Sequence, residues 1–183
     1  MMIKAQETAI KGSYILYPKV FEDHRGSFTE NFNKVDLEGI VGHPLNFVQD
    51  NQSTSHKNVL RGLHFQAGEN AQAKLVSVLR GRALDVIVDL RKDSPTFGKH
   101  FSFELSEDRH TMIFIPKGLA HGFLSLENQT VFSYKCDEYY HLESEGGIIY
   151  NDPDLGINWG VPVSELILSE KDLQLPRFKE LFP

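Results

Sequence analysis

The amino-acid sequence predicts an all-β protein, built as one domain over residues 1–183: a jelly-roll barrel with short helical segments near the C-terminal end. Three observations support this prediction. Residues 83–90, ALDVIVDL, alternate between two faces with the period of two that is typical of a strand. Many similar short stretches are separated by Gly, Pro and Asp turn residues. Patterns typical of helices are few.

The predicted strands follow one another along the chain, with turn residues between them. Gly81 marks one such turn. A short helix is expected at residues 34–39, and Ser169 is a candidate N-cap for a second helix that starts before Asp172. The strands are expected at residues 12–17, 27–33, 47–53, 59–65, 74–81, 83–90, 97–105, 111–115, 122–126, 131–139 and 148–150.

Composition and charge narrow the class of protein. Hydrophobic residues make up 40% and charged residues 24% of the chain, which is ordinary for a globular protein. No apolar run approaches the roughly 20 residues that cross a bilayer, and no secretory signal is recognisable. Cys136 is the one cysteine, which excludes an internal disulfide and suits a reducing compartment. A net charge of −6 disfavours nucleic acid as a partner. We therefore expect a cytoplasmic protein that binds neither nucleic acid nor membranes.

Residues 59–66, VLRGLHFQ, place a cation and a titratable ring inside a stretch that otherwise resembles a buried strand. A lone histidine in a strand is more often structural than catalytic, so His64 by itself would not indicate a catalyst. Arg61 favours a functional interpretation, because a buried guanidinium needs an anionic partner. Lys74, at the head of the next strand, could stabilise a developing oxyanion or extend to the surface.

A second motif, P-x-G-x-x-H, ends at His121 within residues 115–123, IPKGLAHGF. It is the second half of the signature of cupins, a family of small β-barrels, and it makes the predicted barrel cupin-type. The first half of that signature departs from the pattern, because GLH at residues 62–64 stands where metal-binding cupins have H-x-H.

A metal site is one interpretation of these residues. His64, Glu69 and His121 could supply two imidazoles and a carboxylate. Arg61 and Lys74 would repel a divalent cation in the same cavity. The sequence therefore predicts no metal, and it implies no other cofactor.

Two further stretches contain candidate functional residues. Residues 131–140, VFSYKCDEYY, form an aromatic strand, which β-propensity alone would explain. Inside a barrel, however, Tyr134 could donate a proton, and Tyr140 could stack on a flat base. In residues 166–172, LILSEKD, Asp172 by itself would be an acid at the start of a helix.

These motifs occur together in a specific order. On that basis the chain closely resembles the dTDP-4-dehydrorhamnose 3,5-epimerases, which are cupin-fold enzymes that use no metal. The likeness covers residues 21–172. The motifs are FEDHRG (21–26), QDN (49–51), LRGLHFQ (60–66), QAKLV (72–76), RALDVIVDLRKDSPTFG (82–98), IPKGLAHGF (115–123), the Tyr-rich strand, NDPDLGINW (151–159) and LSEKD (168–172).

The resemblance implies epimerisation at carbons 3 and 5 of dTDP-4-keto-6-deoxy-D-glucose to give dTDP-4-dehydro-L-rhamnose. The ketone at carbon 4 acidifies the neighbouring protons, so the reaction needs a base, an acid on the opposite face and a group that holds the enolate. By resemblance, His64 is the base and Asp172 orients its ring. Lys74 would bind the enolate oxygen, and Tyr134 would return the proton. Asp85, on the strand after Lys74, would hold that lysine in place.

The resemblance also assigns substrate-binding residues. Arg61 and His121 would contact the sugar and its diphosphate, and Tyr140 would stack on the thymine. It further implies a homodimer that exchanges N-terminal strands, so that Arg25 and Glu30 would serve the partner's cavity. The remaining substrate-binding positions are Phe21, Gln49, Asn51, Glu145 and Lys171.

Four alternatives remain open at this point. A mono-epimerase that inverts only carbon 3 or only carbon 5 of a dTDP-4-keto-6-deoxy sugar would share the base, the lysine and the nucleotide motifs. A sugar 3,4-ketoisomerase on the same barrel is disfavoured by the LSEKD motif. A non-catalytic cupin that binds or stores a sugar nucleotide would not need His64, Lys74 and Tyr134 together. A metal-dependent cupin dioxygenase would need the metal site that the sequence disfavours.

Overall fold

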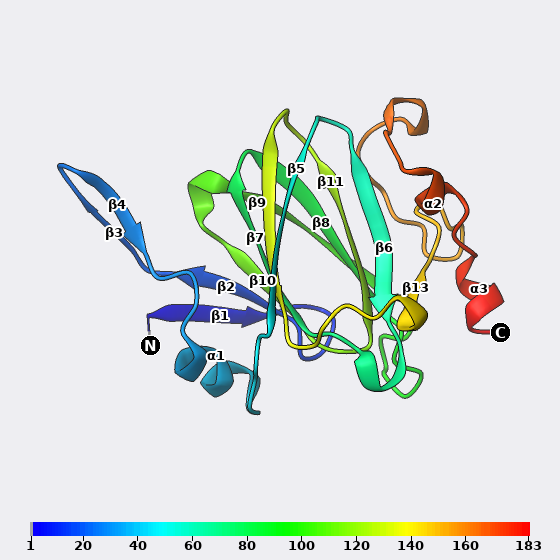
Figure 1. The fold of residues 1–183 in the computed structure, drawn as a ribbon, viewed down its shortest axis with the longest axis horizontal. Helices are drawn as coiled ribbons and strands as arrows, with labels where there is room; N and C mark the ends of the chain where they lie inside the picture. The colour runs from blue at the N-terminus through cyan, green and yellow to red at the C-terminus, as the bar shows by residue number, and fades with distance from the viewer. Residues whose placement is uncertain (1) are drawn as a thin grey trace.

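Two antiparallel sheets packed face to face form the body of the protein in a computed structural model that describes residues 2–183 (Figure 1). The six-stranded sheet consists, in spatial order, of β1 (Ile3–Glu7), β2 (Tyr14–Pro18), β10 (Met112–Ile115), β7 (Lys74–Arg80), β12 (Thr130–Cys136) and β5 (Gln49–Ser55). The five-stranded sheet consists of β13 (Glu145–Gly147), β6 (Leu60–Gln66), β11 (Leu119–Ser125), β8 (Arg82–Asp89) and β9 (His100–Ser106). A separate hairpin consists of β3 (Val20–Asp23) and β4 (Gly26–Thr29).

The main core lies between the two sheets. Val76 and Phe132 of the six-stranded sheet pack there with Ile87 of the five-stranded sheet. Each fully buried side chain of this size contributes about 1.5–3 kcal/mol of hydrophobic stabilisation. Two more clusters cover the outer faces, one with Leu37 of α1 (Lys34–Val41) and one with Trp159 of the C-terminal segment. Both sheets are therefore covered on both sides.

The helices are short and begin at side-chain caps. Asn33 accepts hydrogen bonds from the backbone N–H groups at the start of α1, and Gly42 ends that helix in the left-handed conformation. Ser169 caps α2 (Glu170–Leu173) through the backbone N–H of Asp172, as the sequence predicts. A last helix, α3 (Phe178–Leu181), follows. Within residues 2–183, no helix is both long and apolar enough to cross a membrane.

The prediction of an all-β, cupin-type jelly roll is confirmed, and the structure adds that its two sheets are not closed into one continuous barrel over the described residues. Closure would require an edge strand of one sheet to pair with an edge strand of the other. Across residues 2–183 the strand ladders instead form separate sheets. The alternation in residues 83–90 is confirmed, because Ala83 and Ile87 face the core between the sheets while Val86 and Val88 face the outer cluster.

Several predicted boundaries are wrong. The last strand is residues 145–147 and not 148–150, because the former pair with β6. The strand predicted at 27–33 ends at Thr29. The predicted elements also lack β1 and β3, whose sequences carry little apolar alternation.

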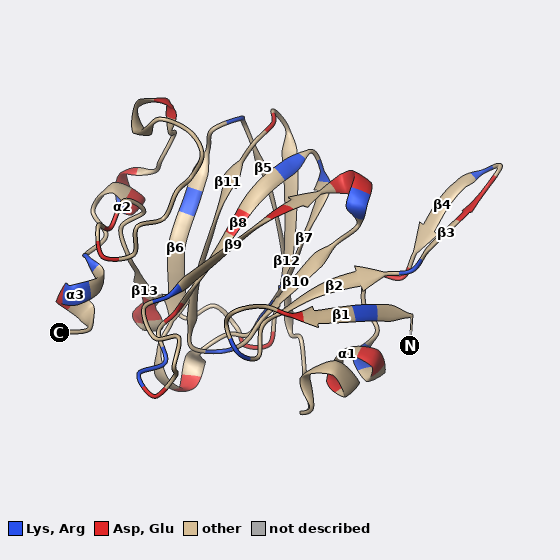
Figure 2. Ribbon diagram, turned by 180° about the vertical axis from the view of Figure 1, so that it is seen from behind, with Lys and Arg blue, Asp and Glu red and all other residues tan. Residues whose placement is uncertain are grey.

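The β3–β4 hairpin projects away from the two sheets (Figure 1). Its aromatic side chains are exposed, Phe21 by 38% and Phe28 by 66%, although their rings lie 6.4 Å apart between centroids. Acidic and basic residues are interspersed over the whole ribbon, including this hairpin (Figure 2). Two neighbouring apolar rings are therefore exposed on a two-stranded ribbon that lies outside both sheets.

Candidate active site

A cavity of about 510 Å³, called the central cavity below, opens between the two sheets. The six-stranded sheet contributes Ser53, Lys74, Phe132 and Tyr134 to its walls. The five-stranded sheet contributes Leu60, Arg61, His64, His121, Gly122 and Phe123, and Val59 precedes it. The C-terminal segment contributes Ile167, Leu168, Ser169, Lys171 and Asp172. A smaller side cavity of about 120 Å³ shares His64, Lys74 and Tyr134 with it and adds Gln49, Asn51, Phe65, Gln66, Gln72, Cys136, Tyr140 and Glu145.

An irregularity in β6 explains how Arg61 and His64 reach the same cavity. Residues three apart on a regular strand point to opposite faces. Here His64 pairs with His121 and Arg61 pairs with Phe123, so β6 carries one residue more than β11 between these pairs. Gly62, with φ of 121°, lies in this bulge. Bulges re-aim side chains in this way, and they are frequent next to active sites.

Close contact between two strands fixes the bulge. A Cβ atom at Gly62 would lie 2.6 Å from the Cα of Gly122, and a Cβ at Gly122 would lie 2.8 Å from the carbonyl oxygen of Arg61. Only glycines permit this approach of the two backbones. The G in LRGLH and the second G in IPKGLAHGF are therefore required by the shape of the site.

His64 is joined to Asp172 across 108 positions of sequence. Its Nε2 lies 2.7 Å from Asp172 Oδ1, and the carboxylate side chain is 5% exposed. Burial alone would raise the pKa of Asp172, but hydrogen bonds from His64, the Gly62 backbone and Ser169 outweigh it and lower the pKa. The ionised carboxylate holds the proton on Nε2, which leaves Nδ1 as the nitrogen able to accept another.

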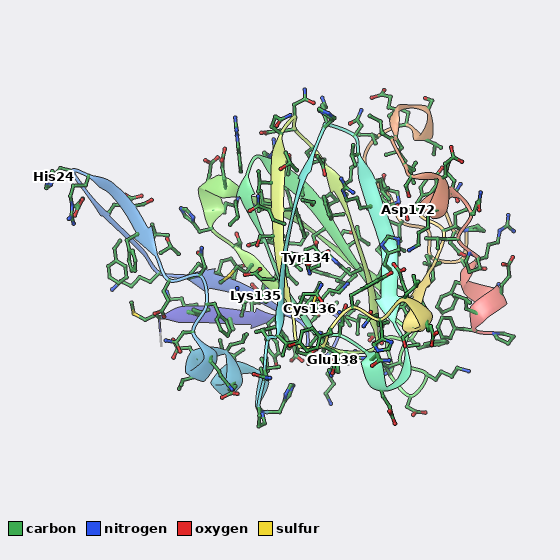
Figure 3. All side chains as sticks on the ribbon, viewed as in Figure 1. His24, Tyr134, Lys135, Cys136, Glu138 and Asp172 are labelled. Atoms are coloured by element: carbon green, nitrogen blue, oxygen red, sulfur yellow. The ribbon has the colours of Figure 1, made fainter. Side chains whose placement is uncertain are left out.

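The C-terminal segment is attached to the start of β6, and this attachment places Asp172 beside His64. Val59 forms a parallel bridge with Ile167, and the Leu60 backbone N–H donates to the Ile167 carbonyl at 3.0 Å. Figure 3 shows Asp172 beside β6 and Tyr134 between the sheets.

Tyr134 and Lys74 lie on neighbouring strands of the six-stranded sheet. The Lys74 Nζ is 5.9 Å from the centre of the Tyr134 ring. Burial raises the pKa of the Tyr134 phenol, and the adjacent Cys136 adds to this effect. Burial also lowers the pKa of Lys74. In the described chain, the Lys74 ammonium makes no hydrogen bond or ion pair, so it is available to bind a ligand.

Asp85 is hydrogen-bonded to a residue other than Lys74. The two residues lie on β8 and β7, which belong to different sheets. Asp85 Oδ1 instead accepts a hydrogen bond of 2.6 Å from His121 Nε2. Its charge still reaches Lys74, since it opposes the lowering of the lysine pKa. Sequence reasoning missed this second His–Asp pair because it depends on the diagonal contact between β8 and β11.

Strand β5 lines both cavities with a polar stripe in which every second residue faces inward. Gln49 donates to Asn51 at 3.0 Å in the side cavity, and Ser53 lines the central cavity. Ser55 accepts a hydrogen bond of 3.2 Å from Arg61 Nε. Arg61 is exposed at the cavity, not buried as the sequence suggested. Sequence analysis missed the two serines, although the alternation in QDNQSTS would have revealed them.

Glu145 connects the two cavities. Its Oε2 accepts hydrogen bonds from the Tyr140 hydroxyl at 2.8 Å and from the Lys171 ammonium at 2.5 Å. Burial would raise the pKa of Glu145, but these two partners lower it. The Gln49 side chain also accepts from the Tyr140 backbone N–H at 2.9 Å. Gln49, Tyr140 and Glu145 thus meet at the side cavity, and Lys171 joins them from the central cavity.

Three predicted binding residues line neither cavity in this one chain. Phe21 and Arg25 belong to the projecting hairpin, where Arg25 pairs with Asp23. Glu30 follows that hairpin, and its Oε1 is buried without a hydrogen-bond partner among the described residues.

A metal centre has little support in the geometry. Throughout residues 2–183, no three His, Cys, Asp or Glu side chains are grouped so that they could hold a metal ion. Glu69, considered as a ligand above, lines neither cavity. The two histidines are each occupied by a carboxylate of their own, Asp172 for His64 and Asp85 for His121.

The arrangement is that of an acid–base site. A histidine–carboxylate pair lies on one sheet, and a protonated phenol and an unpaired ammonium lie on the other. Such a site can remove a proton beside a carbonyl, hold the resulting oxyanion and return a proton from another direction. The fold and the site therefore define an isomerase of the cupin-like class.

Comparison with known proteins identifies the family. The sequence model for dTDP-4-dehydrorhamnose 3,5-epimerase matches residues 7–180. The enzyme of that name from Escherichia coli K12 is 51% identical over 174 residues, 95% of this chain and 94% of that protein. The structure of its counterpart from Elizabethkingia anophelis NUHP1 has a TM-score of 0.95 at 50% identity and 98% coverage of both chains. This chain belongs to the dTDP-4-dehydrorhamnose 3,5-epimerase family.

A further solved structure is similar to this chain and contains a ligand. It is the dTDP-6-deoxy-D-glucose-3,5-epimerase of Legionella pneumophila Philadelphia 1, in complex with dTDP-4-keto-L-rhamnose. Its TM-score is 0.90 at 43% identity, over 96% of this chain and 98% of that one.

Proposed function

We propose that this chain converts dTDP-4-keto-6-deoxy-D-glucose into dTDP-4-dehydro-L-rhamnose by inverting carbons 3 and 5. The observation that carries the proposal is the separation of base and acid. His64, with Asp172, is on the five-stranded sheet, whereas Tyr134 is on the six-stranded sheet across the central cavity. A carbon is inverted when its proton leaves from one face and returns on the other. The family relatives named above support the same reaction.

One base is enough for both carbons. In the chair form of this hexose the hydrogens on carbons 3 and 5 are axial on the same face of the ring. His64 Nδ1 takes each proton in turn, and Asp172 stabilises the imidazolium that forms. Each removal leaves an enolate whose oxygen is derived from the ketone at carbon 4.

Lys74 and Tyr134 complete the reaction from the other sheet. The Lys74 ammonium binds the enolate oxygen, which is favourable in a cavity with little water. Because burial lowers the Lys74 pKa, this contribution is lost as the pH rises through that pKa. Burial raises the Tyr134 pKa, so its phenol stays protonated and can donate to the carbon. After each inversion His64 releases its proton to solvent, and the Tyr134 phenolate takes up a proton from solvent.

The nucleotide occupies the side cavity in this proposal. Tyr140, exposed by 51%, offers a ring on which thymine stacks. Gln49 and Asn51 supply amide groups for the base and sugar, and Lys171 is close to the diphosphate. The ligand held by the Legionella relative, dTDP-4-keto-L-rhamnose, supports a dTDP-sugar as the ligand of this chain.

We also propose that the protein works as a homodimer in the cytoplasm. The exposed rings of Phe21 and Phe28 and the outward position of Arg25 support a hairpin that reaches a second copy. Glu30, with its unpartnered buried oxygen, follows this hairpin. The buried free thiol of Cys136 suits a reducing compartment.

Proton NMR with dTDP-4-keto-6-deoxy-D-glucose in deuterium oxide tests the reaction. Deuterium is expected at both carbons 3 and 5, and a downstream reductase should trap an L-configured product. Deuterium at one carbon alone would instead identify a mono-epimerase. No exchange at either carbon would refute the proposed reaction.

A further inference from the structure

Asp85 and His121 form a second histidine–carboxylate pair inside the molecule. The Asp85 side chain is 1% exposed and the His121 side chain is 8% exposed, and their hydrogen bond is 2.6 Å long. His121 lines the central cavity, whereas Asp85 lies behind it on β8. We propose, on the basis of the proposed function, that Asp85 is a positioning residue that acts through His121, holding its imidazolium as a fixed donor to an oxyanion of the substrate.

The hydrogen bond fixes which way the ring is turned. An ionised carboxylate only accepts, so His121 Nε2 carries the proton that is directed to Asp85. The other nitrogen, Nδ1, is thereby left to the cavity side of the ring. The Phe132 ring lies 5.9 Å from the His121 ring between centroids, and it is stacked on Phe123 at 4.0 Å. The imidazole is thus held by a carboxylate at one end and an aromatic pair along its side.

The charge balance favours the protonated ring. Asp85 Oδ2 is buried and has no hydrogen-bond partner among the described residues. A buried carboxylate needs a compensating cation close by. His121 is its one hydrogen-bonded side-chain partner in the described chain, and Lys74 acts on it only through charge. The titratable or charged groups that face this pair from the surrounding strands are Arg61 and His64 on β6, Lys74 on β7 and Tyr134 on β12.

The location of the pair limits which oxygen of the substrate His121 can contact. His121 is the direct strand partner of His64, the proposed base. An imidazolium at this point is next to the reacting sugar, with the exposed Arg61 farther along β6. The oxyanion is either the enolate oxygen or a diphosphate oxygen. Loss of the interaction would reduce kcat in the first case and raise KM in the second.

The test is a double-mutant cycle with Asp85→Asn and His121→Asn, measured as a full pH profile. If Asp85 acts through His121, Asp85→Asn lowers kcat/KM by about 10- to 100-fold. It also changes the pH profile of kcat/KM, because the negative charge that faces the His121 ring is removed. Asp85→Asn then has almost no further effect in the His121→Asn background. Asp50→Asn, an exposed carboxylate that pairs with Lys135, is the control.

Two results would overturn the proposal. If Asp85→Asn lowers only the melting temperature and leaves the pH profile unchanged, the pair is merely structural. If its effect persists in full in the His121→Asn background, Asp85 acts on another group such as Lys74. Nitrogen-15 NMR of His121 in the substrate-free protein provides an independent check. It should show a proton on Nε2 of His121 in the wild type and a changed signal from that nitrogen in Asp85→Asn, even if the proposed substrate is wrong.

Discussion

The two nitrogens of His64 have different environments, and this difference assigns their tasks. Nε2 is bound to the buried carboxylate of Asp172, so it carries a proton throughout the reaction. Nδ1 is then the atom that takes the proton from the sugar. A histidine with 29% of its side chain exposed remains open to the cavity, while its partner acid stays almost fully buried.

His64→Ala should therefore lower deuterium exchange at both carbon 3 and carbon 5 by at least about 100-fold, because one base serves both. Proton NMR in deuterium oxide measures the two rates in one sample. His43→Ala, at an exposed histidine bonded to Pro44, is a suitable control. Exchange at either carbon at the wild-type rate would remove His64 from the role of base.

Tyr134→Phe should separate the two halves of the reaction. The base remains, so deuterium exchange continues, but productive inversion, which is followed at carbon 5, is lost because the phenol that returns the proton is absent. Comparing the exchange rate with the configuration of the trapped product measures both. Tyr17→Phe, on the outlying strand β2, should change neither. Normal inversion at carbon 5 would exclude Tyr134 as the acid.

At the scale of elements, the bulge in β6 is the feature on which the site most depends. Gly62→Ala would force a Cβ to within 2.6 Å of the Gly122 backbone, at a φ that L-residues rarely adopt. We expect a loss of stability of about 1–3 kcal/mol and a large loss of kcat, since Arg61 and His64 would be re-aimed. Urea unfolding and the exchange assay measure the two effects.

The matched control for this variant is Gly68→Ala. Gly68 also has a positive φ of 64°, but a Cβ there meets no atom within 4 Å. Its substitution should cost about 1–2 kcal/mol in stability through the backbone conformation alone and leave kcat unchanged. Equal losses of kcat in both variants would show that the close approach of β6 and β11 is unimportant.

The turn after β8 is organised by one buried carboxylate. Asp89 accepts hydrogen bonds from Arg91, Ser94 and Thr96. Burial alone would raise the Asp89 pKa, but these bonds outweigh burial and hold the pKa far below its usual value. A lowered folded-state pKa gives stability that is present above about pH 4 and lost as the pH falls. Asp89→Asn should thus cost about 3–5 kcal/mol at pH 7.

Urea unfolding as a function of pH checks this prediction. The difference between Asp89→Asn and the wild type should shrink as the pH falls below about 4, where the wild-type carboxylate begins to lose its advantage. The exposed Asp93→Asn is the control. A difference that is the same at pH 3 and pH 7 would contradict an ionic role for Asp89.

Sequence reasoning succeeded for elements whose pattern is local. The alternation of residues 83–90 and the Ser169 cap are properties of a few neighbouring residues, and both are confirmed. The shared direction of Arg61 and His64 could not be derived in this way, because regular alternation puts them on opposite faces. The partner of Asp85 likewise depends on which sheet each strand joins.

At the scale of the whole molecule, the proposed exchange of hairpins makes a complementation experiment possible. His64→Ala inactivates its own cavity, whereas Arg25→Ala inactivates the partner's. A heterodimer of these two variants has one intact site, so co-expression should restore about a quarter of the wild-type activity when dimers form at random. If each Arg25 serves its own chain, the mixture stays as inactive as the separate variants.

The attachment of Asp172 to His64 across 108 positions has a consequence for biosynthesis. Translation proceeds from the N-terminus, so the ribosome releases the strands that carry His64, Lys74 and Tyr134 well before the segment that carries Asp172. A chain that ends at residue 160 contains every strand of both sheets but lacks the carboxylate that orients the His64 imidazole. Catalytic competence therefore arises late in synthesis, when the α2 segment docks on β6.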